Sequence, residues 1–284
     1  MENTESMAPH QLIEDQGFII FRNVFDDNDI RSLRSTMDEA FKKEPSKARV
    51  NPTRQISNCS SNVPQLNWIL SHDKFIQCIR DALNTNDIVY TSVFAIQRDM
   101  MGGWHKDDGT GSSELGYFLE LPYGNKECKV VRIAFYLQKH DSRYPGILLS
   151  PGSHKYKSWS VDKFICPELN PGDVIIFDVR LNHSGTPRSK LYQAIAKIIP
   201  AKYQVWLGRI SSVFRMLSVT LSRKNKHAIF MAFGVDNSHT VTYSKSLMKN
   251  QLSQPPGGDC GLPSQAKQIL DKKNIKYLAR SEFI

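Results

Sequence analysis

The sequence predicts an α+β fold with a double-stranded β-helix (jelly roll) core, flanking N-terminal helices and a helical insertion between two late strands. Residues 1–87 carry mainly helical periodicity, whereas short apolar runs rich in β-branched and aromatic residues follow from Ile88 onward, separated by Gly, Pro, Asn and Asp. Helices followed by a run of short strands indicate an α+β chain built on a double sheet. The length of 284 residues suits one large domain.

The N-terminal part begins with a short helix and a strand over Phe18–Phe21. After a turn, Ile30, Leu33, Met37 and Phe41 recur at spacings of three and four residues, which predicts an amphipathic helix. Asp27 or Asn28 is the expected cap of that helix, because a short polar side chain there can accept a backbone hydrogen bond. The run "DKFIQCIRDALNT" predicts a further helix.

The core is expected over residues 88–240, and residues 241–284 are expected to form a C-terminal tail. Residues 190–222, which show helical periodicity and a break at Pro200, are expected to be the insertion. The predicted strands are "IVYTSVFAIQ" (88–97), "YFLELPYG" (117–124), "KVVRIAFYLQ" (129–138), "GILLSPGSH" (146–154), "GDVIIFDVR" (172–180) and "HAIFMAFG" (227–234).

Composition and sequence patterns argue against a secreted, membrane-spanning or disulfide-rich protein. The polar start "MENTESMAPHQ" does not resemble a secretory signal, and the longest apolar candidate for a membrane span is broken by Arg209 and Arg215. The five cysteines are scattered, with no C-x-x-C pair, which argues against a disulfide scaffold or a cysteine zinc site. We therefore expect a cytoplasmic protein.

The net charge of +9 is unevenly distributed, because no acidic residue lies between Asp178 and Asp236 while basic residues recur throughout. This field favours an anionic or lipid-linked small molecule as partner, although a solvated basic surface is the plain alternative. Nucleic acid is not expected, since no helix-turn-helix or zinc-finger spacing is present. The basic, apolar segment 190–222 predicts a lid, a peripheral membrane contact, a subunit contact or a packed helix pair.

Three residues suggest a metal site. In "GGWHKDDG", His105 and Asp107 lie two residues apart, so they share a face if Trp104–Asp107 ends a strand. A third ligand is expected far downstream, and His183 ends the strand predicted in "NPGDVIIFDVRLNHSGTP". Two histidines and one carboxylate are typical of non-haem Fe(II), although zinc also accepts these ligands. Asp108 is out of register for that face.

The chain resembles the phytanoyl-CoA dioxygenase-like family of Fe(II)/2-oxoglutarate-dependent oxygenases. The resemblance runs from "DQGFIIFRNVF" to "AIFMAFGVDNSH" and is carried by "WHKDD", "VRIAFYLQKHD", "GILLSPGSHKY", "NPGDVIIFD" and "NHSGTP". It implies one oxygenase domain in which His105, Asp107 and His183 bind Fe(II), and in which 2-oxoglutarate and O₂ hydroxylate a small-molecule, lipid- or sugar-linked substrate with release of succinate and CO₂. The retained Asp107 implies a hydroxylase rather than a halogenase, because halogenating relatives lack this carboxylate.

The family also places a basic residue about ten positions after the distal histidine, to pair with the C5 carboxylate of 2-oxoglutarate. Here that position falls inside the insertion, and four candidates remain. We favour Arg223, whose guanidinium can bind a carboxylate through two hydrogen bonds, narrowly over Lys226, which has the better strand register. Arg188 and Arg132 are the others.

Two other readings stay open. A cupin-like metalloprotein, such as a metal-dependent isomerase or hydrolase, would keep the jelly roll and the metal without 2-oxoglutarate. A non-catalytic binding protein would keep the fold alone, although three assembled ligands argue against it.

Overall fold

The computed structural model describes residues 7–43, 54–98, 103–111, 113–141, 146–158, 161, 163–185, 226–253 and 261–278. The helices are α1 (Pro9–Gln16), α2 (Asp27–Lys43), α3 (Cys59–Asn62), α4 (Asp73–Leu83), α7 (Ser238–Ser253) and α8 (Ser264–Lys272), with 3₁₀ turns η1 (Pro64–Ser71) and η2 (Ser153–Lys155). The insertion expected over 190–222 lies outside the described residues.

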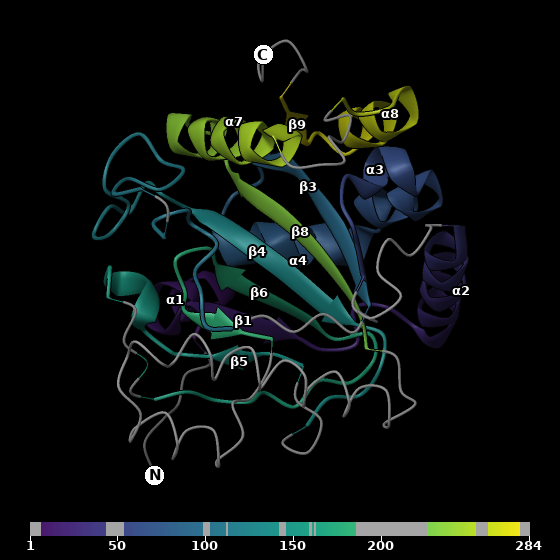
Figure 1. The fold of residues 1–284 in the computed structure, drawn as a ribbon, viewed down its shortest axis with the longest axis horizontal. Helices are drawn as coiled ribbons and strands as arrows, with labels where there is room; N and C mark the ends of the chain where they lie inside the picture. The colour runs from purple at the N-terminus through teal and green to yellow at the C-terminus, as the bar shows by residue number, and fades with distance from the viewer. Residues whose placement is uncertain are drawn as a thin grey trace.

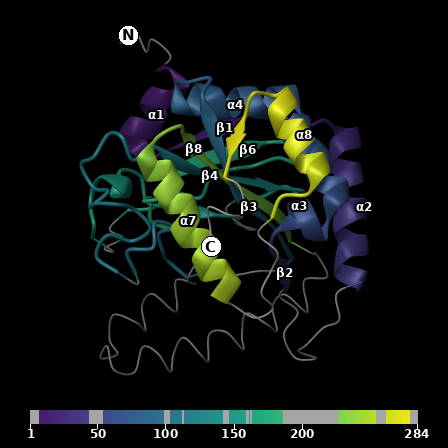
Figure 2. The ribbon, with the colours of Figure 1, turned by 90° about the horizontal axis from the view of Figure 1, so that it is seen from above.

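The strands form two sheets, as a jelly roll requires. The larger has the order β1-β6-β4-β8-β3-β2, made from β1 (Phe18–Phe21), β2 (Arg54–Ile56), β3 (Ile88–Arg98), β4 (Val130–Tyr136), β6 (Val174–Asp178) and β8 (His227–Val235), with β9 (Lys276–Tyr277) pairing to β3. The smaller pairs β5 (Leu148–Leu149) with β7 (His183–Ser184). Figures 1 and 2 show α4 on one side of the large sheet and α7 on the other.

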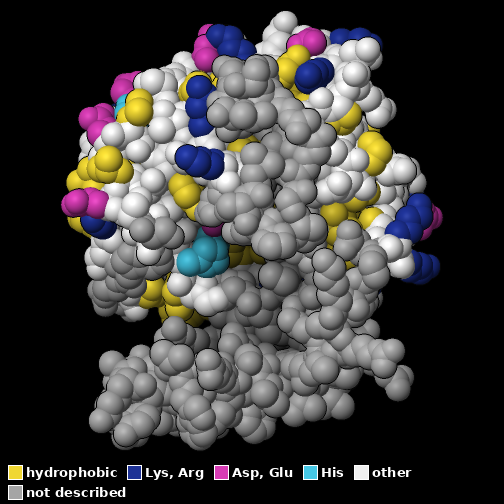
Figure 3. Space-filling view, turned by 45° about the horizontal axis from the view of Figure 1, so that its top comes forward, with side chains coloured by type: hydrophobic (Ala, Val, Ile, Leu, Met, Phe, Trp, Pro, Cys, Tyr) yellow, Lys and Arg dark blue, Asp and Glu magenta, His cyan; other side chains and the backbone are white. Residues whose placement is uncertain are grey.

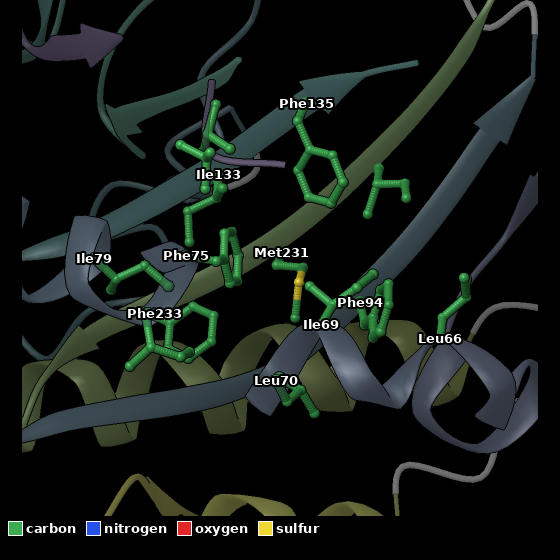
Figure 4. Close-up of a cluster of buried hydrophobic side chains, with 14 of the residues drawn as sticks. Leu66, Ile69, Leu70, Phe75, Ile79, Phe94, Ile133, Phe135, Met231 and Phe233 are labelled. Atoms are coloured by element: carbon green, nitrogen blue, oxygen red, sulfur yellow. The ribbon is translucent and has the colours of Figure 1, made fainter. Parts of the chain in front are cut away.

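One face of the large sheet carries the main hydrophobic core. Side chains from β3, β4 and β8 interlock there with those of η1 and α4, and α2 and α8 extend the same cluster. Each large side chain buried in this way contributes about 1.5–3 kcal/mol. Figure 4 labels Leu66, Ile69, Leu70, Phe75, Ile79, Phe94, Ile133, Phe135, Met231 and Phe233.

The opposite face of the large sheet forms the inside of the jelly roll. Alternation along the strands sends Ala134, Tyr136, Phe177 and Ala228 to this side, where they pack against Leu149 of the small sheet. Further along the same face, α7 covers the sheet through Met248 and its neighbours. In Figure 1, α7 crosses above the β4–β8–β3 end of the sheet.

Several local expectations were wrong. Residues 117–124 form turns rather than a strand, because Tyr117 N–H donates to Asp108 O (2.8 Å) and Tyr123 O–H to the Asp108 carboxylate. Helix α2 is capped by Asp26, not by Asp27 or Asn28: its Oδ1 accepts from the N–H groups of Asn28 (2.8 Å) and Asp29 (2.9 Å).

The expected C-terminal tail is largely built into the fold. Residues 241–284 contribute most of α7, all of α8 and the strand β9. Ala266, Leu270 and Ile275 from this stretch are buried in the main core. The helix and the strand that carry them are short, so their apolar pattern gave little sign of this burial.

Among the helices that the structure describes, none is long and apolar enough to cross a membrane. On the face shown in Figure 3, Lys and Arg side chains of the described residues are scattered, and some of them lie beside Asp or Glu side chains. Most of the basic stretch between Asp178 and Asp236 lies outside the described residues.

Candidate functional site

The structure brings the three predicted ligands together. His105 and His183 form an isolated β-bridge in which each backbone N–H donates to the other's carbonyl oxygen (3.0 Å in both cases). The N–H of Asp107 donates to Val179 O (2.8 Å), which ties the same two segments again. One ligand atom from each of the three side chains lies within 4.8 Å of the other two.

The local structure around the ligands differs from the expected strand ends. Strand β3 ends at Arg98, and His105 takes part only in the bridge. Strand β6 ends at Asp178, because its carboxylate accepts from the backbone N–H (2.8 Å) and guanidinium of Arg180, forming a turn. His183 therefore begins the separate strand β7 instead of ending β6.

Backbone carbonyls fix the tautomer of both imidazoles. His105 Nδ1 lies 2.7 Å from Gly103 O, and His183 Nδ1 lies 3.0 Å from Leu181 O. Because a carbonyl oxygen only accepts, each Nδ1 carries the proton and each Nε2 offers a lone pair. Metal-ligating histidines are commonly oriented by such a bond.

The two Nε2 atoms converge on the carboxylate of Asp107. That of His105 lies 3.7 Å from Oδ1, and that of His183 lies 3.6 Å from Oδ2. These separations exceed a hydrogen bond and are compatible with donors arranged around one small cation. The donor set fits a single divalent metal ion.

Burial and charge prepare these groups for metal binding. Burial lowers the pKa of His183 to about 4, against the opposing effect of Asp107, so its imidazole is neutral at pH 7. Burial alone would raise the pKa of Asp107, but the charge of Arg132 and its hydrogen bond to the carboxylate hold that pKa well below its usual range. The carboxylate is therefore ionised.

Arg132, one of the four basic candidates, contacts the carboxylate of Asp107. Its Nε–H donates to Oδ2 (2.8 Å), and its side chain is 16% exposed. Burial alone would lower the pKa of the Arg132 guanidinium, but the negative charge of Asp107 has the larger effect and raises that pKa.

Lys226 immediately precedes β8, in register with the inward-facing Ala228. Its Nζ donates to Gly146 O (2.7 Å) and to Gly185 O (2.9 Å), and lies 5.6 Å from the ring centroid of Tyr136. Gly185 is two residues beyond His183. The remaining candidates, Arg188 and Arg223, lie outside the described residues.

The turn Pro151–His154, within the run "GILLSPGSHKY", supports both ligand segments. Lys106, between His105 and Asp107, donates from Nζ to Ser153 O (2.9 Å) and to Tyr156 O. Ser153 Oγ accepts from the N–H of Asn182 (2.8 Å), the neighbour of His183. The motif is part of the family resemblance, but the sequence did not predict its contacts with the ligand segments.

Helix α7 also supports the site, which the sequence did not indicate. Tyr243 O–H donates to Asp107 O (3.2 Å), and its ring packs edge-on against Tyr117. No spacing pattern links Tyr243 to a motif 136 residues earlier. A cavity of about 320 Å³ opens beside the ligands, lined by His105, Lys106, Asp107, Gly109, Gly111, Tyr117, Arg132 and Leu247.

Comparisons with known proteins agree with this fold. The family model "Phytanoyl-CoA dioxygenase (PhyH)" matches residues 13–191. No curated protein sequence matches the chain.

Among solved structures, the chain is similar to the non-heme alpha ketoglutarate dependent epimerase SnoN from nogalamycin biosynthesis (TM-score 0.55, 8% identity, 79% of this chain and 80% of that chain). It is also similar to HygX from Streptomyces hygroscopicus with nickel and 2-oxoglutarate bound (0.55, 13%, 80% and 85%) and to EctD from S. alaskensis with 2-oxoglutarate and 5-hydroxyectoine (0.54, 13%, 84% and 80%).

These structural likenesses show the jelly-roll fold, and the family model covers more than half of the chain, including His105, Asp107 and His183. The chain belongs to the phytanoyl-CoA dioxygenase family.

Proposed function

We propose that the protein is an Fe(II)/2-oxoglutarate-dependent dioxygenase that hydroxylates a small molecule and releases succinate and CO₂. The convergence of the two imidazole Nε2 atoms and one carboxylate on a single point carries this proposal. Such a facial triad is typical of non-haem Fe(II) enzymes. When bound, Fe(II) with 2-oxoglutarate and O₂ supplies the oxidising chemistry.

Each residue of the site has a defined task in this proposal. His105, Asp107 and His183 hold the metal, and the carbonyls of Gly103 and Leu181 keep both imidazoles correctly oriented. Phe177, whose ring centroid lies 4.7 Å from that of His183, excludes water from the inner side. Loss of one metal ligand should therefore remove metal binding while leaving the fold.

Arg223, the residue favoured from the sequence, lies outside the described residues, and among those described we propose Lys226 as the residue that binds the C5 carboxylate of 2-oxoglutarate. Its ammonium reaches the inside of the jelly roll near Gly185, and Tyr136 beside it supplies a second polar group. The small side chains of Ala134 and Ala228 lie on the same inner face. Arg132 donates to Asp107, one of the metal ligands, and so lies beside the metal, whereas the C5 carboxylate is the end of 2-oxoglutarate farther from it.

Binding measurements test the metal and the cosubstrate separately. Anaerobic calorimetry with Mn(II), followed by 2-oxoglutarate, should give one site for each in the wild type and none for Mn(II) in His105→Ala. Lys226→Ala should weaken 2-oxoglutarate binding about 10- to 100-fold, the range for a charged hydrogen bond, without changing Mn(II) affinity. Lys245→Ala, which removes an exposed lysine of α7, is the matched control.

Turnover then tests the reaction type. Succinate release from 2-oxoglutarate without added substrate is expected in the wild type and not in His105→Ala. Mn(II) binding without 2-oxoglutarate affinity would instead support a metalloprotein that does not use this cosubstrate. Because similar folds include an epimerase and a carbocyclase, product analysis by mass spectrometry must show an added oxygen atom for hydroxylation to stand.

A further inference from the structure

Arg132 has more hydrogen-bond donors than the described residues satisfy. An arginine presents five N–H groups, and in the described part of the chain only its Nε–H has an acceptor, Asp107 Oδ2. Nη1 is buried without a hydrogen-bond partner. A charged donor left in this state costs about 1–3 kcal/mol or more.

The cavity beside the metal ligands is where these donors can reach a bound molecule. Arg132 lines it together with Tyr117 and Leu247, an aromatic and an aliphatic side chain. Gly109 makes room for the ring of Tyr117, since a Cβ there would lie 2.7 Å from the ring. The cavity thus joins an apolar wall to a guanidinium whose terminal nitrogens have no hydrogen-bond acceptor among the described residues.

We propose that the terminal nitrogens of Arg132 bind a carboxylate of the substrate in this cavity. A guanidinium has a planar fork of donors that matches a carboxylate, and Asp107 already fixes its orientation through Nε. The substrate would then be a small carboxylic acid with an apolar body facing Tyr117 and Leu247. This inference rests on the proposed function, because it describes the substrate of the same metal site.

The carboxylate is assigned to the substrate rather than to 2-oxoglutarate because of where the two cations lie. Arg132 pairs with Ala232 across β4 and β8, whereas Tyr136 pairs with Ala228, next to Lys226. Four residues of strand separate Arg132 from Tyr136, roughly 13 Å. Lys226 does not line the cavity that contains Arg132.

The test uses matched acids and amides as probes. Wild-type protein loaded with Mn(II) and 2-oxoglutarate is titrated calorimetrically with acetate, hexanoate and phenylacetate, and with the corresponding primary amides. At least one acid should bind about 10-fold more tightly than its amide, the effect of a charge-assisted pair. Arg132→Met should abolish that preference, and Arg132→Lys should reduce it.

Controls separate this role from support of the metal and from the cosubstrate. Arg132→Lys keeps a charge beside Asp107, and circular dichroism and Mn(II) affinity report whether its fold and metal site persist. The exposed Arg31→Lys on α2 is the matched control. A fall in 2-oxoglutarate affinity in Arg132→Lys, with no acid preference in the wild type, would assign the guanidinium to the cosubstrate and overturn the proposal.

Three other results would each overturn the proposal that Arg132 binds a substrate carboxylate. These are equal binding of acids and amides, binding of neither, and a preference for acids that survives in both Arg132 variants. Repeating the titration on the Mn(II) form without 2-oxoglutarate separates this failure from failure of the proposed function. A chain that binds no 2-oxoglutarate but still prefers acids through Arg132 would contradict only the proposed function.

Discussion

Ser153 joins the two segments that carry the proposed metal ligands. Its Oγ accepts from Asn182 N–H and donates to Ser150 O (2.7 Å), while its carbonyl accepts from Lys106. Asn182 and Lys106 are the neighbours of His183 and His105. A small displacement of Ser153 is therefore transmitted to both imidazoles.

We predict that Ser153→Ala lowers the free energy of unfolding by about 1–2 kcal/mol and weakens Mn(II) binding. Ser71→Ala is the control, because Ser71 Oγ makes the same kind of bond, to Trp68 O (2.7 Å), without touching a ligand segment. Urea unfolding and calorimetry measure the two effects. If both variants leave Mn(II) affinity unchanged, Ser153 does not position the ligands.

His154, the next residue, predicts a pH dependence of stability. Burial lowers its pKa below the usual 6.5, so the folded protein holds it neutral where the unfolded chain begins to take up a proton. Its contribution to stability is complete above pH 6.5 and is lost as the pH falls below that value. In the metal-free protein, His154→Gln should therefore show a shallower loss of stability between pH 7 and pH 5.5 than the wild type. Parallel urea-unfolding curves for the two proteins would contradict this.

At the level of elements, α7 connects the last long strand to the metal site. Gly234 of β8 lies against Thr240 of α7: a Cβ there would overlap the side chain of Thr240 and lie 3.0 Å from Lys129 O. Gly234→Ala should displace α7, and with it Tyr243 and Leu247.

We expect Gly234→Ala to cost about 1–3 kcal/mol in the free energy of unfolding, as overpacking does, and to weaken Mn(II) binding. Gly103→Ala is the control for stability, because a Cβ at Gly103 meets nothing within 4 Å. Thermal unfolding and calorimetry check the result. Equal stability of the two variants would mean that α7 tolerates the shift.

The sequence predicted elements well where apolar residues reflect burial. Helix α2 was found from its apolar spacing at three and four residues, and the strands β3, β4, β6 and β8 were found as short apolar runs, because both faces of these central strands are largely buried. The pattern failed in residues 117–124, where hydrogen bonds to the buried Asp108 shape the chain while Leu119 is 56% exposed. Long-range contacts such as Tyr243 with Asp107 leave no local pattern, so this part of the site could not be predicted.

In the whole molecule, the main hydrophobic core and the candidate metal site lie on opposite faces of the large sheet. Its helix-covered face holds the main core, and its inner face holds His183 against Phe177 and the cavity beside Arg132. The C-terminal α8 belongs to the main core on the first face, since Leu270 is fully buried in that core. Damage to that face should therefore change the stability of the protein without changing the site.

We predict that Leu270→Ala lowers the free energy of unfolding by about 2–5 kcal/mol, the cost of a cavity in a packed core. A domain with a stability of about 10 kcal/mol, the middle of the usual range, remains mostly folded after this loss. Its Mn(II) affinity, measured at low temperature where the variant is folded, should stay within about 2-fold of the wild type, because changes at distant sites are usually independent. His105→Ala should show the reverse, with metal binding lost and stability of the metal-free protein kept. If Leu270→Ala weakened metal binding as strongly as Gly234→Ala, the two faces would be coupled through the sheet, and α8 would have to be counted as part of the site.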